Sequence, residues 1–202
     1  MPSTQAAPWR LFIALPLPVD AAAAIEQVLL PYAAAFPRAR WLPRGALHVT
    51  LRFLGATPND QLPALEQSVE RLVAAGVPGV DARIAAITGP GAGRARGGDG
   101  VAWLTIASGA SQIAGLAARL TDLLTALPVL LPVEVAARPS PEPHLTVARH
   151  ADQPLIDALA AMALGPLRVG WQADRVVLFR SHPSRGAASY EPLHEASLVG
   201  PA

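Results

Sequence analysis

Hydrophobic and polar positions follow two different periods along the chain, and the change of period separates strands from helices. Compact or alternating apolar runs rich in β-branched and aromatic residues are typical of strands. Such runs predict strands at 9–15, 47–54, 80–87 and 101–107, with shorter ones at 133–136 and 145–148. Three more, at 167–171, 175–179 and 190–198, are expected to form a terminal meander.

Apolar residues spaced by three or four positions predict helices between these strands. The predicted helices cover residues 20–35, 57–76, 113–127 and 152–164. Thr57 before Pro58, and Asp152 further on, have the side chains expected of helix N-caps. Pro31 is expected to kink or end the first helix, and the glycine-rich segment 89–100 is expected to be a loop.

The order of the predicted elements indicates the fold class and a repeat. Strands and helices are interleaved, which excludes a sandwich or a bundle and leaves α/β or α+β. The order strand–helix–strand followed by paired strands occurs twice, which indicates an internal duplication. No linker-like segment separates the halves of the 202-residue chain, so they are expected to share an interface.

The composition limits the kinds of ligand the protein can bind and the kinds of catalytic or metal site it can form. Sixteen basic residues, all arginine, stand against 15 acidic ones, for a net charge of +1. Proteins that bind a nucleic-acid duplex over many phosphates usually have a larger excess of basic residues. The expected ligand is therefore a small anion or the end of one strand. The absence of cysteine excludes disulfides, thiolate zinc sites and cysteine nucleophiles.

The chain is also expected to be a cytoplasmic protein without a membrane anchor. Its N-terminal apolar run is broken by Pro16 and Pro18, and Asp20 lies where a signal-peptide cleavage region would be. No apolar stretch reaches the roughly 18 residues that a membrane span needs. Half of the residues (51 %) are hydrophobic, enough for a sizeable core.

Two of the five histidines begin a His-x-Thr tripeptide in matching surroundings. His48 and Thr50 lie in Leu-His-Val-Thr-Leu-Arg-Phe, and His144 and Thr146 lie in Pro-His-Leu-Thr-Val-Ala-Arg. Threonine occupies 8 of the 202 positions, so two such tripeptides arise by chance at a frequency of only about 2 %. The other three histidines have no such threonine and are interpreted as non-catalytic.

The spacing gives these residues a shared face and a shared chemistry. Residues i and i+2 of a strand point to the same face, so each histidine projects together with its threonine. If the two halves pack about a pseudo-twofold axis, two imidazoles and two hydroxyls meet in one cleft. One imidazole can then accept a proton from water while the other donates one to a leaving alkoxide, and the hydroxyls can bind phosphate oxygens.

Arg149, five positions after His144, is a candidate phosphate clamp. It lies three positions after Thr146, so on a regular strand it points to the opposite face, and it can reach the phosphate only if the strand ends or bulges. The sequence contains no HxH or HExxH pattern and no dense acidic cluster, so we expect neither a metal nor another cofactor.

With these motifs the chain resembles the 2H phosphoesterases, and within them the bacterial RNA 2′,3′-cyclic phosphodiesterases, also called 2′-5′ RNA ligases. The resemblance covers nearly the whole chain and is carried by residues 10–14, 41–43, 47–55, 143–149, 176–179 and 189–191. It implies an α+β fold in a single bilobal domain over residues 1–202, with one motif in each lobe of antiparallel sheet and helices. One departure, the acidic and proline-rich stretch 139–142, concerns the edge of the cleft.

The resemblance also implies a reaction, a substrate and residue roles. It implies metal-independent opening of an RNA terminal 2′,3′-cyclic phosphate to a 2′-phosphate, with minor reverse 2′-5′ ligation. His48 is then the proton donor and His144 the base, and the phosphate is held by Thr50, Thr146 and Arg149. The expected partners are RNA 3′ ends or small cyclic nucleotides, and the protein is expected to be a monomer.

Several alternatives stay open at the level of sequence. Phe12 and Phe53 are candidates for stacking on a terminal base, although both lie in apolar runs typical of a core. The same site would suit ADP-ribose 1″,2″-cyclic phosphate or 2′-5′ oligonucleotides. A non-catalytic RNA-end binding module and a metallohydrolase are further alternatives. Arginines near the first motif are candidates for guiding an RNA backbone: Arg38, Arg40, Arg44 and Arg52.

Overall fold

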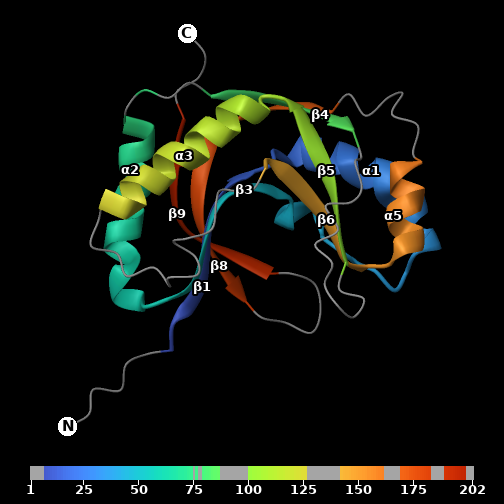
Figure 1. Ribbon diagram of the computed structural model, residues 1–202, viewed down its shortest axis with the longest axis horizontal. Helices are drawn as coiled ribbons and strands as arrows, with labels where there is room; N and C mark the ends of the chain where they lie inside the picture. The colour runs from blue at the N-terminus through green and yellow to red at the C-terminus, as the bar shows by residue number, and fades with distance from the viewer. Residues whose placement is uncertain are drawn as a thin grey trace.

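A computed structural model describes residues 7–74, 76, 79–86, 100–126, 142–161, 169–182 and 189–198. In this part of the chain the fold is α+β, with one nine-stranded sheet and four α-helices (Figure 1). Every strand pairing is antiparallel. The predicted fold class is therefore confirmed. The segments 89–99 and 133–136 lie outside the described residues.

The strands are β1 (Trp9–Pro16), β2 (Arg40–Trp41), β3 (His48–Thr57), β4 (Val80–Ala86), β5 (Gly100–Ser108), β6 (His144–Ala151), β7 (Gly170–Ala173), β8 (Arg175–His182) and β9 (Ser189–Ser197). The helices are α1 (Val19–Ala35), α2 (Leu62–Ala74), α3 (Ala110–Ala126) and α5 (Gln153–Ala160). Two single 3₁₀ turns, η1 (Arg44–Ala46) and η2 (Asn59–Gln61), precede β3 and α2.

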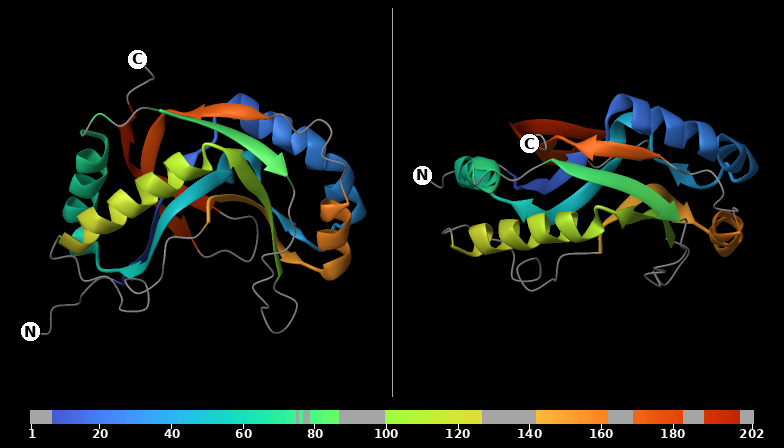
Figure 2. Two further views of the ribbon diagram at one scale, coloured as in Figure 1. Left: turned by 45° about the horizontal axis from the view of Figure 1, so that its top comes forward. Right: turned by 90° about the horizontal axis from the view of Figure 1, so that it is seen from above.

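The sheet consists of two equivalent halves of four strands each. Its strand order is β7-β4-β5-β6-β3-β1-β8-β9, and β2 pairs with β6 beside this path. The two strands that carry the His-x-Thr motifs, β3 and β6, are the innermost strand of each half. Helices α2 and α3 pack together at one end of the sheet, and α1 packs with α5 at the other (Figures 1 and 2). The two motifs therefore meet at the centre of the molecule.

The repeated order predicted from the sequence is present, with an exchange of strands. The first repeat runs β1-α1-β3-α2-β4 and the second runs β5-α3-β6-α5-β8. The last strand of each repeat pairs with the first strand of the other, because β4 pairs with β5 and β8 pairs with β1. Each half of the sheet is therefore completed by the other repeat.

The predicted terminal meander is confirmed for β8 and β9, which pair with each other, and is wrong for β7. β7 pairs with β4 in one half of the sheet, whereas β8 pairs with β1 and β9 in the other. Only Asp174 separates the two strands, so the chain crosses from one half to the other at this residue. The Asp174 carbonyl accepts a hydrogen bond from the Leu198 amide at 2.7 Å. Trp171 and Ala173 of β7 are buried in the common core, which draws β7 away from β8.

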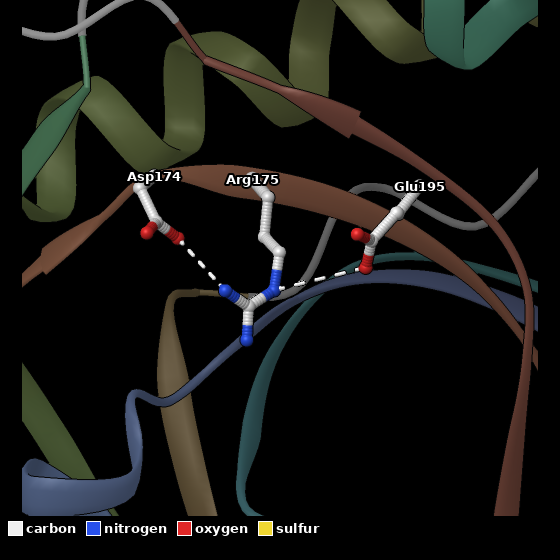
Figure 3. A network of polar contacts seen from close by, with 3 residues as sticks. All are labelled: Asp174, Arg175 and Glu195. Carbon is white, nitrogen blue, oxygen red and sulfur yellow. Dashed lines mark hydrogen bonds and ion pairs between the residues drawn. The ribbon is translucent and has the colours of Figure 1, made fainter.

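The side chains at this crossing form an exposed ion network (Figure 3). Arg175 lies between Asp174, at 3.4 Å, and Glu195, at 3.9 Å. Exposed pairs of this kind contribute at most about 1 kcal/mol. The crossing is therefore held mainly by the buried strands on either side of it.

The helices follow their predicted apolar faces, with differences at their ends. Leu65, Val69 and Leu72 of α2 are buried, as are Ile113 and Leu120 of α3, which confirms both stripes. Asp152 caps α5 by accepting a hydrogen bond from the Leu155 amide at 3.0 Å, as predicted.

Two predicted helix ends differ from the structure. Thr57 is not an N-cap: it ends β3, its buried hydroxyl donates to the Leu54 carbonyl, and α2 begins only at Leu62 after η2. α1 ends at Ala35, as predicted, so Pro31 lies inside the helix and does not end it. α5 ends at Ala160, short of the predicted residue 164. Local residue preferences are thus overridden by the packing of neighbouring strands.

Candidate active site

The two His-x-Thr motifs are related by a pseudo-twofold axis at the junction of β3 and β6. The two strands pair antiparallel, with Val49 opposite Leu145. In this register His48 lies opposite Thr146, and Thr50 lies opposite His144. Val49 and Leu145 are fully buried on the core side, so the two histidines and two threonines share the other face of the sheet, called here the motif face.

Both histidines are oriented by the same backbone contact. Nδ1 of His48 lies 2.8 Å from the Ala46 carbonyl oxygen, and Nδ1 of His144 lies 2.7 Å from the Glu142 carbonyl oxygen. A carbonyl can only accept, so each Nδ1 must carry a hydrogen and donate it. Nε2 of each neutral ring is therefore left with a lone pair, ready to accept a proton.

A β-bulge follows the threonine in each motif. Thr50 pairs with Ala14 and Arg52 with Ile13, so Leu51 is an extra residue in β3. The same shift occurs in β6, where Thr146 pairs with Trp103 and Ala148 with Ala102, which leaves Val147 as the extra residue. A bulge reverses the alternation of the strand beyond it.

The bulges decide which residues join the motif face. Beyond them, Phe53 and Arg149, each five positions after its histidine, point to the same side as the histidines. Arg149 is exposed and its charge acts on His48, lowering the pKa of the imidazole. The bulge that brings Arg149 to the side of the histidines is therefore present. Phe53 occupies the twofold-equivalent position and is 50 % exposed.

Aromatic rings enclose His48 on its side of the axis. The ring of His48 lies 4.8 Å from that of Phe12 and 5.2 Å from that of Tyr190, measured between centroids. Phe179 packs against Phe12 at 5.2 Å. Burial disfavours the imidazolium and lowers the pKa of His48 to about 4, with smaller contributions from the charges of Arg149 and His144.

The lowered pKa makes the stability of the fold depend on pH. The ordinary pKa of histidine is 6.5, so between about pH 6.5 and 4 the unfolded chain binds a proton at His48 that the folded chain does not. The contribution of neutral His48 is fully present above pH 6.5 and is lost as the pH falls toward 4.

Opening this ring cluster should raise the pKa of His48. A Tyr190→Ala substitution removes one enclosing ring and admits water, so we expect the pKa to move from about 4 toward 6.5. The pKa is measured by NMR titration of the His48 ring. Phe53→Ala is the matched control, because Phe53 contacts Phe12 at 6.2 Å and no described ring contact joins it to His48. Equal titration midpoints in wild type and Tyr190→Ala would contradict this account.

The motif face beside His144 holds two residues that the sequence did not single out. Trp103 of β5 pairs with Thr146, and Thr105 pairs with His144. The Trp103 ring lies 5.1 Å from the His144 ring, at 41° to it. The signal was the alternation in β5, where Ala102 and Leu104 are buried and Trp103 is half-buried. This alternation places Trp103 beside His144 only because β5 pairs with β6, and that pairing could not be predicted from the sequence.

The predicted arginines divide between the surface and the interior. Arg40 of β2 lies opposite Arg149 in the sheet. Arg38 and Arg44 are exposed. Arg52 is only 4 % exposed, and burial lowers its pKa, so its position does not suit contact with an RNA backbone.

The two predicted stacking residues have different surroundings. Phe12 is 3 % exposed and lies among the rings around His48, so it has no free face to offer a base. Phe53 is half exposed and does have a free face on which a base can stack. Among the described residues, no group of three or more histidine, cysteine, aspartate or glutamate side chains is placed to hold a metal ion. No helix in this part of the chain is long and apolar enough to cross a membrane.

Comparison with known proteins points to one family. The family model described as the 2′-5′ RNA ligase superfamily matches residues 17–185. Among solved structures, E. coli LigT in its apo form has a TM-score of 0.70 at 23 % identity, and the match covers 96 % of this chain and 99 % of that one. TT0787 of Thermus thermophilus has a TM-score of 0.69 at 24 % identity, with 95 % and 98 % covered.

A third solved structure, described only as a phosphoesterase, has a TM-score of 0.65 at 25 % identity and covers 95 % of this chain and 99 % of its own. No curated protein matches the sequence.

Proposed function

The chain belongs to the 2′-5′ RNA ligase superfamily, and from this premise we propose that it hydrolyses the 2′,3′-cyclic phosphate at RNA ends to a 2′-phosphate. The observation that carries the proposal is the twofold arrangement of the motifs, in which both imidazoles have a fixed Nδ1–H and an available Nε2. Solved structures of E. coli LigT, whose fold this chain shares, include complexes with 3′-AMP and with phosphate, and this supports a ligand that carries a phosphate group.

The proposed reaction is an in-line displacement at phosphorus. Water attacks the phosphorus and the P–O3′ bond breaks, so the 2′-phosphate remains on the ribose. Nε2 of one histidine accepts the proton of the water, and Nε2 of the other donates a proton to O3′. Thr50, Thr146 and the guanidinium of Arg149 hold the non-bridging oxygens, whose negative charge grows in the transition state.

The family resemblance assigns the base to His144 and the acid to His48. A pKa of about 4 keeps His48 neutral near pH 7 in the free protein, which opposes its role as acid. A bound phosphodiester anion reverses this effect, because an opposite charge within a few ångströms raises the pKa of an imidazole by about one to three units. We therefore propose that substrate binding promotes protonation of His48.

An assay with a defined substrate tests this function. The protein is incubated with an oligonucleotide ending in a 2′,3′-cyclic phosphate, in excess chelator, and the products are identified by mass spectrometry and by comparison with 2′- and 3′-phosphate standards. The expected result is complete conversion to the 2′-phosphate at a rate that the chelator does not change. A 3′-phosphate product, dependence on added metal, or binding without turnover would each refute the proposal.

A further inference from the structure

The motif face is asymmetric at the position beside each threonine. The residue paired with Thr50 is Ala14, which is fully buried, whereas the residue paired with Thr146 is Trp103. The two pairs are equivalent under the pseudo-twofold axis. An indole therefore stands on the His144 side where the His48 side has only a methyl group.

The core does not account for this tryptophan. Its neighbours Ala102 and Leu104 are 4 % and 0 % exposed and point into the core, so the Trp103 side chain points to the motif face. There it remains half-buried, and the ring lies 5.1 Å from that of His144. A partly exposed aromatic ring next to a phosphate site is the kind of surface on which a nucleobase stacks, and such stacking tolerates any base.

The direction of the reaction determines which nucleoside lies there. In an in-line displacement the attacking and leaving oxygens lie on opposite sides of phosphorus. If O3′ leaves toward His48, as the proposed function assigns it, the ribose of the terminal nucleotide lies on the His48 side. The attacking group then lies on the His144 side, where Trp103 is.

We infer that Trp103 binds the second nucleoside of a 2′-5′-linked substrate, the one joined through its O5′. The inference rests on the proposed function and deepens it. In cleavage of such a linkage, the 3′-hydroxyl attacks phosphorus, the P–O3′ bond forms and the P–O5′ bond breaks. His48 accepts the proton of the 3′-hydroxyl, and His144 donates a proton to O5′, so a cyclic phosphate and a 5′-hydroxyl are released.

The same two histidines exchange roles between the two reactions. In either role the Nδ1 hydrogen of His48 is held by the Ala46 carbonyl, so Nε2 is the atom that accepts or donates the proton.

The test compares two substrates in three proteins. Wild type, Trp103→Ala and Trp103→Phe are assayed for kcat and KM with 2′-5′-linked diadenosine monophosphate and with adenosine 2′,3′-cyclic phosphate, and Leu30→Ala serves as an exposed control. For Trp103→Ala we expect the ratio of kcat/KM for the dinucleotide to that for the cyclic nucleotide to fall by about 5- to 100-fold, mainly through KM. Trp103→Phe keeps a flat ring and should retain most of the ratio.

Three results would overturn the inference. An equal fall in kcat for both substrates would mean that Trp103 only positions His144. A selective loss with the cyclic nucleotide would place the terminal nucleoside, and not the second one, on Trp103. If the wild type hydrolyses the cyclic nucleotide but does not cleave the dinucleotide, the protein has no subsite for a second nucleoside. If the wild type leaves the cyclic nucleotide intact, it is the proposed function that fails.

Discussion

His144→Ala and His48→Ala are each expected to lower the rate of cyclic-phosphate hydrolysis by about 10²- to 10⁴-fold, the contribution of a positioned proton donor or acceptor. Both rings lie on the motif face and are only partly buried, so neither substitution should unfold the protein. The rates are measured with a 2′,3′-cyclic nucleotide, and circular dichroism checks the fold. His194→Ala is the control, because His194 lies on β9 and contacts Glu70 of α2 at 2.8 Å.

The same two variants assign the acid and the base. A variant without the general acid loses less activity when the leaving group departs without protonation. In a nucleoside 2′-(4-nitrophenyl phosphate) the 3′-hydroxyl attacks from the His48 side and the nitrophenolate leaves on the His144 side, so this substrate should restore activity to His144→Ala and not to His48→Ala. Restoration of His48→Ala alone would reverse the two roles. If either variant keeps full activity on the cyclic phosphate, the substituted histidine has no role in the mechanism.

Leu145→Ala should cost about 2–5 kcal/mol of unfolding free energy, as expected for truncation of a fully buried leucine. Leu145 is 0 % exposed and faces Val49 across the junction of β3 and β6. The loss is measured by denaturant unfolding. Leu30→Ala makes the same chemical change at a side chain that is 49 % exposed, and it should cost far less.

Activity should also fall in Leu145→Ala under conditions where the variant is still folded. The pair of Val49 and Leu145 sets the register that places each histidine opposite the threonine of the other motif, so loosening it disturbs both motifs at once. A variant as stable as Leu30→Ala, or one with undiminished kcat while folded, would show that the junction does not hold the site together.

The sequence predicted the elements of the fold because hydrophobic periodicity is a local property. The strands at the two motifs, the stripes of α2 and α3 and the Asp152 cap all follow from residues close together in the chain. The pairing of β7 with β4 was missed, since a strand's partner depends on distant residues. The N-cap expected at Thr57 failed for the same reason, because pairing with β1 extends β3 to this residue.

The residues of the candidate site that belong to the repeated motif could be predicted from the sequence. Those that join the site through the pairing of strands could not. The matched tripeptides singled out His48 and His144 as candidates, and Arg149 was added because it lies five positions after His144. Neither could reveal the two bulges, because a bulge is a mismatch of register between two strands. Trp103 was invisible in the same way, as it belongs to the site only through its pairing with Thr146.

The exchange of the last strand between the repeats makes each repeat depend on the other for a complete sheet. A single repeat on its own would lack the strand that completes its half of the sheet, and its first strand would present an open edge. Two identical copies would satisfy each other by exchanging β4-like strands about an exact twofold axis. The exchange therefore joins the two repeats into one unit, although the two sides of its centre differ: the position five residues after the histidine is Arg149 on one side and Phe53 on the other.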